Sequence, residues 1–259
     1  MPAYETISTA IRNAKAKGDP AILAYITAGF PRRDTFRAQL GDVAAAADVV
    51  EIGVPFTDPM ADGTTIQRSS RAALDQGVSL RWILSELTAP GPKPAAPLLL
   101  MSYLNPLLAY GLDKLPKAAA EAGVSGFIVP DLPYEESQDL HDALQAYGIA
   151  LVQFVTPVTP VERMTMLCKA SRGFVYGVTM TGTTGKNAAV PQAVLDYFAR
   201  VKQVAPVPVC AGFGIRSRDQ VERIAPYVDG VIVGSALVEV IERGEDPAKF
   251  LRALRAPTR

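Results

Sequence analysis

Short apolar runs alternate with longer, more polar segments along the whole chain. Several runs are rich in Val, Ile and Leu and carry no polar alternation, which is typical of strands covered on both faces. We predict eight strands, over residues 21–26, 48–52, 97–102, 126–129, 149–154, 173–178, 207–211 and 230–233. Strands that alternate with helices in this way predict right-handed crossovers and a parallel sheet.

The segments between these runs have the periodicity of amphipathic helices. In the segment 133–147, for example, Leu140, Leu144 and Tyr147 recur at helical spacing. Gly148 follows as a helix stop. Strand–helix pairs therefore follow one another along the sequence.

Eight such pairs favour a closed barrel over an open, doubly wound sheet. The first strand is not followed by a Gly-x-Gly-x-x-Gly turn, so a dinucleotide-binding open sheet loses its main support. Ahead of that strand, 4–17 predicts an extra amphipathic helix with Ile7 and Ile11 as its apolar stripe. The Pro- and Gly-rich segment 90–97 is typical of a loop and not of a domain linker. We therefore expect a single α/β domain over 1–259, a (β/α)8 TIM barrel with an extra N-terminal helix.

Composition and charge exclude several classes of partner. The 26 basic and 26 acidic residues balance, whereas a nucleic-acid-binding domain normally carries a basic surplus. The N-terminal sequence lacks the layout of a secretory signal, and runs such as 98–101 are far shorter than the roughly 20 residues that span a bilayer. Cys168 and Cys210 form neither a CxxC pair nor a disulfide framework. We expect a cytoplasmic protein that binds neither nucleic acid nor membrane.

The most informative polar residue of the chain is Glu51, in the second predicted strand. Because side chains alternate along a strand, Val50, Ile52 and Val54 share one face and Glu51 lies on the other. The wholly apolar face should meet the helices, so Glu51 is predicted to point into the barrel near its carboxyl-terminal rim, where barrel active sites lie. Loss of water there raises the pKa of a carboxyl towards neutrality, as a general acid–base group requires. The alternative is a buried carboxylate paired with an arginine.

A second carboxylate, Asp62, ends a proline-bracketed loop that can fold back over the same barrel mouth. The alternative for Asp62 is a turn residue before Gly63. Asp58, in the same loop, has the same ambiguity and can cap a turn.

Two glycine-containing loops predict a phosphate site. Gly214 lies in the loop after the seventh strand, and Gly234 and Ser235 follow the eighth. Glycines let backbone N–H groups approach an anion, and Ser235 can cap a helix whose positive end faces the ligand. One such loop is usually a plain turn, but two at consecutive barrel positions indicate phosphate binding. The loop 179–187 has the small polar composition of a mobile lid.

Residue types that are missing narrow the chemistry. A Schiff-base aldolase needs a lysine pointing into the barrel, but every lysine falls in a predicted helix or loop, with Lys186 nearest the mouth. A metal-dependent aldolase or epimerase would use several imidazoles, but His141 is the only histidine and lies on a polar helix face. With Schiff-base and metal-dependent reactions disfavoured, the sequence favours acid–base chemistry by carboxylates without a metal ion.

The segment from Glu51 to Gly63 resembles, without a gap, the signature of the tryptophan synthase α-chain family. The resemblance implies a lyase of tryptophan biosynthesis that cleaves indole-3-glycerol phosphate into indole and glyceraldehyde 3-phosphate. It implies Glu51 as the proton shuttle and Asp62 as the second catalytic acid. Cleavage needs a proton added at indole C3 and one removed from the adjacent side-chain hydroxyl. Glu51 can do both in succession, while Asp62 holds the ring nitrogen and stabilises its positive charge.

The resemblance continues through the later loops. It assigns phosphate contacts to Gly185, Gly214, Gly234 and Ser235, a lid-closing role to Thr184 and a place near the substrate to Tyr176. Candidate walls of the indole pocket are Tyr25, Met101, Ile128 and Phe213, each of which equally fits the barrel core. Asp131, at the end of the fourth strand, is interpreted as a supporting residue. The chain departs from the family with Thr183 where valine is common and Thr64 where proline usually follows Asp-Gly.

The resemblance spans nearly the whole chain and implies a partner. The family forms an α2β2 complex with a β chain that carries pyridoxal phosphate and receives indole through a channel. Pro55 and Asp58 match family positions that contact the β chain. We expect neither a cofactor nor a metal ion in this chain. Some relatives act alone and release indole, and that alternative stays open.

Two other functions fit part of this sequence pattern. One is another phosphate-binding barrel of the same pathway, such as indole-3-glycerol-phosphate synthase, which uses a lysine inside the barrel, or phosphoribosylanthranilate isomerase. The other is a non-catalytic barrel that binds a phosphorylated metabolite. The second explains the glycine loops but leaves a buried Glu51 unexplained.

Overall fold

The computed structural model describes residues 1–179, 190–212 and 214–255. Within these ranges, eight parallel strands form a closed barrel and pair in chain order. The strands are β1 (Ala21–Thr27), β2 (Val49–Gly53), β3 (Leu98–Met101), β4 (Val124–Ile128), β5 (Ala150–Val155), β6 (Val175–Val178), β7 (Val209–Gly212) and β8 (Gly230–Val233). β8 closes on β1, with Ala21 opposite Gly230. The TIM barrel predicted from the sequence is confirmed.

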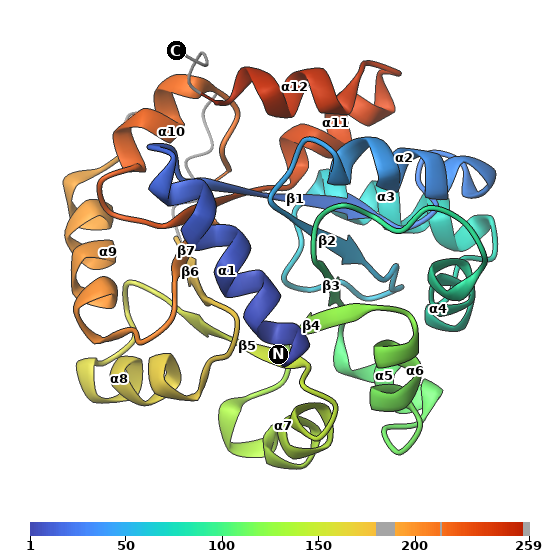
Figure 1. Cartoon of the computed structure of the whole chain (residues 1–259), viewed down its shortest axis with the longest axis horizontal. Helices are drawn as coiled ribbons and strands as arrows, with labels where there is room; N and C mark the ends of the chain where they lie inside the picture. The colour runs from blue at the N-terminus through green and yellow to red at the C-terminus, as the bar shows by residue number, and fades with distance from the viewer. Residues whose placement is uncertain (180–189, 213, 256–259) are drawn as a thin grey trace.

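Helices surround the barrel (Figure 1). They are α1 (Ala3–Ala16), α2 (Phe36–Ala44), α3 (Thr64–Asp75), α4 (Leu80–Thr88), α5 (Leu104–Tyr110), α6 (Leu115–Glu121), α7 (Gln138–Gln145), α8 (Val161–Ala170), α9 (Gln192–Val204), α10 (Arg218–Ile224), α11 (Ser235–Glu242) and α12 (Pro247–Ala253). The short 3-10 helices η1 (Arg33–Thr35) and η2 (Tyr134–Glu136) precede α2 and α7. In the described ranges, no helix has the length and apolar character needed to cross a membrane.

Helix α1 is the extra N-terminal helix, and it lies across one end of the barrel (Figure 1). Ile7 and Ile11 are fully buried and belong to the same apolar cluster as Leu23 of β1 and Val49 of β2, inside the barrel. Burial of an isoleucine side chain contributes about 1.5–3 kcal/mol. Apolar packing thus closes the amino-terminal end of the barrel and leaves the carboxyl-terminal end for a site.

Side chains of β2 alternate between the two sides of the barrel wall, as predicted. Val50 and Ile52 belong to the cluster between barrel and helices, which includes Phe36 of α2, whereas Val49 belongs to the inner cluster. Glu51 therefore faces the barrel interior.

The segment 133–147 is not one continuous helix. It divides into η2 and α7, and at the junction the Ser137 hydroxyl donates a hydrogen bond to the Tyr134 carbonyl at 2.8 Å. Tyr147 lies beyond the end of α7 and is 48% exposed. The buried stripe of this helix consists of Leu140 and Leu144 alone. The predicted third member, Tyr147, was wrong because the helix ends before it.

Candidate active site

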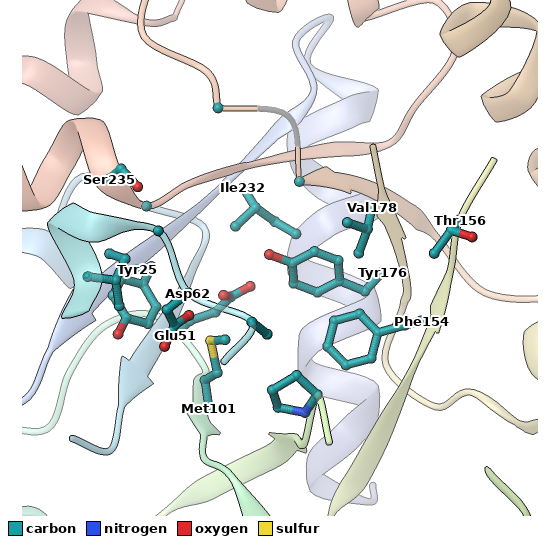
Figure 2. A pocket seen from close by; sticks show the side chains of 17 residues that line it. Tyr25, Glu51, Asp62, Met101, Phe154, Thr156, Tyr176, Val178, Ile232 and Ser235 are labelled. Atoms are coloured by element: carbon teal, nitrogen blue, oxygen red, sulfur yellow. The ribbon is translucent and has the colours of Figure 1, made fainter. Parts of the chain in front are cut away.

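A cavity of about 420 Å³ opens at the carboxyl ends of the barrel strands, and Glu51 and Asp62 both line it. Figure 2 shows both side chains among the aromatic and aliphatic residues that line the cavity. Strand β2 supplies Glu51, and the loop that follows β2 supplies Asp62. The loop therefore folds back over the barrel mouth, as the sequence predicts.

Glu51 is an isolated buried carboxyl group. It is 1% exposed, and neither of its side-chain oxygens has a hydrogen-bond partner among the described residues. Burial raises the pKa of Glu51 to about 8, so the group is largely protonated at neutral pH. No arginine in the described part of the chain pairs with it, which removes the alternative of a structural ion pair. Burial of an unsatisfied polar group costs about 1–3 kcal/mol, and such groups are typical of functional sites.

Asp62 is half-buried and lines the same cavity as Glu51. Burial raises the pKa of Asp62 to about 6, and a hydrogen bond from the Tyr103 hydroxyl opposes this shift. The same hydroxyl accepts the Ala61 N–H at 2.9 Å. Two carboxyl groups in one pocket thus have different pKa values, because Glu51 is more deeply buried than Asp62 and has no hydrogen-bond partner among the described residues, whereas Asp62 has one.

Tyr103 is a site residue that the sequence analysis missed. It precedes α5, immediately beyond β3, and its ring stacks on Phe56 at a centroid distance of 5.3 Å. Asp131 accepts the Leu104 N–H at 2.9 Å and so fixes the start of α5, next to Tyr103. Asp131 is exposed and supports the site indirectly, in line with the role expected for it. Tyr103 could have been predicted from its position just after the third predicted strand, because active sites of barrels lie at that rim.

The described walls of the cavity are mostly apolar. Tyr25, Met101 and Tyr176 line it, as expected from the sequence. Ile128 does not: it is fully buried in the inner barrel cluster and is not among the residues that line the cavity, so its assignment to the pocket was wrong. Wall residues that the sequence analysis missed are Ile66, Pro130, Phe154, Thr156, Val178 and Ile232.

Phe154 is a pocket residue that could have been predicted from the sequence. It is paired in register with Tyr176 on the neighbouring strand, and the two ring centroids are 4.9 Å apart. An inward-facing residue at the carboxyl end of a predicted strand is positioned to line the pocket.

Another part of the cavity wall has the features of an anion site. Gly214, Gly234 and Ser235 line it. Gly214 has φ +68°, a left-handed conformation that favours glycine. Helix α11 begins at Ser235, and its first N–H groups have no partner within the helix, so they present partial positive charge. Gly234 is the N-cap and Ser235 the first helical residue, which makes no side-chain cap bond; the predicted capping role of Ser235 was wrong.

Several predicted residues lie outside the described ranges. They are Thr183, Thr184, Gly185 and Lys186 of the expected lid, and Phe213 of the expected wall.

The loop between the two carboxylates contains the expected partner contacts. Pro55 is buried in this chain, whereas Asp58 is exposed, and the neighbouring Met60 is 87% exposed. Thr64, where the family usually has proline, is the first residue of α3 after the N-cap Gly63. Proline is favoured at the first position of a helix, and α3 also begins there with threonine in its place.

Lysine and histidine, the residue types that a Schiff-base or metal-dependent reaction would use, do not line the described part of the cavity. Among the described lining residues there is no lysine. His141 is half-buried on α7, and the described part of the chain holds no cluster of three or more His, Cys, Asp and Glu side chains of the kind that binds a metal ion.

Comparison with known proteins identifies the family. A sequence model described as tryptophan synthase alpha chain matches residues 11–258. The tryptophan synthase alpha chain of Desulfovibrio desulfuricans is 45% identical over 244 residues, which cover 93% of this chain and 96% of that protein. That of Bacillus mycoides is 39% identical over 254 residues, covering 97% of each.

Solved structures give the same result. A structure of Mycobacterium tuberculosis tryptophan synthase superposes with a TM-score of 0.87 at 35% identity and covers 96% of each chain. The alpha subunit of Legionella pneumophila tryptophan synthase superposes with a TM-score of 0.86 at 30% identity, covering 98% of this chain and 97% of that one. With a matching family model over most of its length and a paired carboxylate site in the barrel mouth, the chain belongs to the tryptophan synthase alpha chain family, whose reaction is the cleavage of indole-3-glycerol phosphate.

Proposed function

We propose that Glu51 and Asp62 carry out the cleavage of indole-3-glycerol phosphate by acid–base chemistry, without a metal ion or a Schiff base. The observation that carries this assignment is the Glu51 carboxyl, which opens onto the pocket and has no hydrogen-bond partner among the described residues. A partnerless acid in a mostly apolar pocket is suited to proton transfer to a bound substrate.

Glu51 starts the reaction in its protonated form. With a pKa of about 8, it can donate a proton to C3 of the indole ring near neutral pH. The resulting carboxylate then removes the proton of the hydroxyl on the adjacent side-chain carbon. As that oxygen forms an aldehyde, the bond between C3 and the side-chain carbon breaks and its electron pair returns to the ring. Glu51 ends protonated, and the products are indole and glyceraldehyde 3-phosphate.

Asp62 acts in its ionised form. Protonation at C3 places positive charge on the ring nitrogen, and a carboxylate that accepts the N–H hydrogen bond stabilises that charge. The hydrogen bond from Tyr103 supports this role, because donation to a carboxylate favours its charged form.

The rest of the pocket holds the two ends of the substrate. We assign the phosphate to Gly214, Gly234 and Ser235, since the amino terminus of α11 favours an anion there. The indole ring is assigned to the space between Tyr25, Met101 and Tyr176. The same proposal includes Gly185 as a phosphate contact, with Thr184 and Phe213 closing and lining the pocket.

We further propose that the chain, as one barrel domain in the cytoplasm, joins a β chain in an α2β2 complex and binds no cofactor itself. Solved relatives described as tryptophan synthase support such a complex, and pyridoxal phosphate is assigned to the β chain. Pro55 and Asp58 are the proposed contacts, of which Asp58 is exposed. Adding purified β chain should raise the lyase rate; no change in rate would favour a chain that acts alone.

The residue assignment is tested by Glu51→Gln, which keeps the size of the side chain but cannot transfer a proton. We expect turnover to fall by about 10²–10⁴-fold, the usual contribution of a positioned acid–base group. Binding of indole-3-glycerol phosphate, measured by calorimetry, should change little. A variant with wild-type turnover would overturn the assignment. Wild-type protein that binds the substrate but never cleaves it would indicate a binding protein instead.

A further inference from the structure

A second cavity, of about 330 Å³, adjoins the active-site pocket. Gly63, Gly214 and Ser235 line both cavities, so the two share part of their walls next to the proposed phosphate site. No arginine or lysine lines the described part of the active-site pocket. The second cavity, in contrast, contains two charged side chains, Arg216 and Glu239.

Arg216, Glu239 and Thr65 form a hydrogen-bonded cluster in the second cavity, which we call the Glu239 clamp. The Arg216 guanidinium donates two hydrogen bonds to the Glu239 carboxylate, from Nη1 at 2.7 Å and from Nη2 at 2.9 Å. The Thr65 hydroxyl donates to the same carboxylate at 3.3 Å. The charged side chains are only 30% and 28% exposed, and Arg216 lowers the pKa of Glu239. Two parallel bonds between planar groups fix their orientation as well as their distance.

Two members of the Glu239 clamp belong to the segments to which the phosphate is assigned. Arg216 follows Gly214 by two residues, and Glu239 lies about one helical turn beyond Ser235 on α11. The Arg216 backbone N–H donates to the side-chain oxygen of Gln220 at 2.7 Å. The loop after β7 is thus attached to α10 through its backbone and to α11 through the guanidinium.

The third member, Thr65, connects the same carboxylate to the segment that follows Asp62. Thr65 is the second residue of α3, three positions after Asp62. Close to it, the Gln67 side-chain amide donates to the Asp62 carbonyl at 2.8 Å. Helices α3 and α11 are in contact (Figure 1). Glu239 therefore joins the start of α3, α11 and the loop after β7.

We propose that the Glu239 clamp holds the loop after β7 against α11 in the spacing that phosphate binding requires, so that Arg216 and Glu239 are positioning residues for the phosphate end of the substrate. The inference rests on the phosphate site proposed above. A phosphate held by two segments loses affinity when either segment is displaced. Because the two charges of the pair cancel, the clamp acts through geometry and not through attraction of the anion.

Two single variants separate geometry from charge. Arg216→Ala leaves an unpaired negative charge on Glu239, whereas Glu239→Ala leaves an unpaired positive charge on Arg216. An effect of charge alone would weaken anion binding in the first variant and strengthen it in the second. We expect both variants to bind glycerol 3-phosphate about three- to tenfold more weakly, a loss within the usual range of coupling for a hydrogen-bonded pair. Calorimetry on the full chain measures this affinity.

Further variants test whether the two residues act as one unit. The double variant with Ala at both positions should bind no more weakly than the weaker single variant, because the clamp is already broken in each. Glu239→Gln keeps an acceptor and should lose less affinity than Glu239→Ala. It is also the milder change if the alanine variant does not fold. The affinity for indole, which has no phosphate, should stay unchanged, and KM for indole-3-glycerol phosphate should rise by the same factor as the glycerol 3-phosphate affinity falls.

Arg68→Ala is the matched control. Arg68 makes the same kind of two-bond ion pair with Glu242, also between α3 and α11, but neither residue lines the second cavity. This variant should bind glycerol 3-phosphate as the wild type does. A loss equal to that of Arg216→Ala would show that any ion pair between these helices has the same effect, and would overturn the proposal.

Ser235→Asp tests the phosphate site separately, because it places a negative charge at that site. Wild-type affinity for glycerol 3-phosphate in Ser235→Asp would overturn the phosphate assignment itself. If Ser235→Asp loses binding, three results would overturn the Glu239 clamp alone: wild-type affinity in Arg216→Ala, tighter binding in Glu239→Ala, or an equal loss of affinity for indole.

Discussion

The Tyr103 hydroxyl donates a hydrogen bond to the Asp62 carboxyl and at the same time accepts the Ala61 N–H at 2.9 Å. One side chain, anchored just beyond β3, therefore holds the end of the loop that follows β2 and lowers the pKa of its carboxyl. Without this bond, burial alone would raise the pKa of Asp62 above its present value of about 6.

We therefore expect Tyr103→Phe to move the acidic limb of the pH–rate profile to higher pH. The variant loses the donor to ionised Asp62, so the pKa of Asp62 rises by roughly one unit, as for loss of one hydrogen bond to a charged group. Turnover at pH 8 should change less than turnover at pH 6. Tyr147→Phe, which changes a tyrosine that is 48% exposed, provides the control. A uniform loss of activity at all pH values would contradict this role of Tyr103.

For the wild-type protein we predict a bell-shaped pH–rate profile. The reaction as proposed needs Asp62 ionised and Glu51 protonated, so the rate should be highest between their pKa values of about 6 and about 8. Asp62→Asn should lower the maximum rate by about 10²-fold or more, since it removes the charge that stabilises the ring nitrogen. Initial rates from pH 5 to pH 9.5 test both statements, and a rate that still rises above pH 9 would show that the acid form of Glu51 is not required.

Much of this site was predictable because it depends on local alternation. The position of Glu51 followed from the apolar character of Val50 and Ile52, since a strand in a barrel wall must direct alternate residues inward. The alternation of side chains along a strand predicts whether a residue faces the barrel interior or the helices. It does not predict whether an inward-facing residue lines the cavity or lies in the apolar core. Met101 and Ile128 are register partners, yet Met101 lines the cavity and Ile128 lies in the core.

What was missed depends on contacts between segments far apart in the sequence. Tyr103 contacts the Asp62 loop from the start of α5, where Asp131 of the loop after β4 accepts the Leu104 N–H. The beginning of β7 at Val209 was predicted two residues too early, because Pro208 has no N–H to donate to a neighbouring strand. The contact between Tyr103 and the Asp62 loop cannot be predicted from a hydrophobic pattern. The start of β7, in contrast, could have been predicted from Pro208.

Glu51 should destabilise the folded protein as pH rises. The pKa of Glu51 is raised from 4.5 to about 8 in the folded state, so between these values the folded chain binds more protons than the unfolded chain. Stability therefore falls with increasing pH across this window, by at most roughly 5 kcal/mol at 1.36 kcal/mol per pKa unit. Glu51→Gln should be more stable than wild type at pH 8.5 and lose that advantage towards pH 4.5. Urea unfolding at both pH values measures the difference; the same difference at both would show that the pKa of Glu51 is not raised by folding.

Helix α1 should contribute to stability and not to catalysis. Ile11→Ala removes a fully buried side chain from the inner cluster, at a cost of about 2–5 kcal/mol in the free energy of unfolding. Ile11→Val, as the graded control, should cost about 0.5–1.5 kcal/mol. Because α1 covers the end of the barrel opposite the pocket, KM and kcat below the unfolding temperature should stay near wild-type values. A large change in KM with unchanged stability would show that the helix influences the site.

Gly53→Ala should disable the site through contact with Tyr25. A Cβ at residue 53 would come within 2.1 Å of the Tyr25 hydroxyl oxygen and 2.5 Å of the ring carbon that carries it, so the rigid phenol must move. Tyr25 lines the pocket beside Glu51, and a displacement of about 1 Å can reduce a rate by about 10²-fold. Gly41→Ala is the control, since a Cβ there meets nothing within 4 Å. Gly53→Ala should therefore lose turnover and substrate affinity together, measured by steady-state kinetics and calorimetry, whereas Gly41→Ala should retain both; wild-type kinetics in Gly53→Ala would show that the tyrosine can move without cost to the reaction.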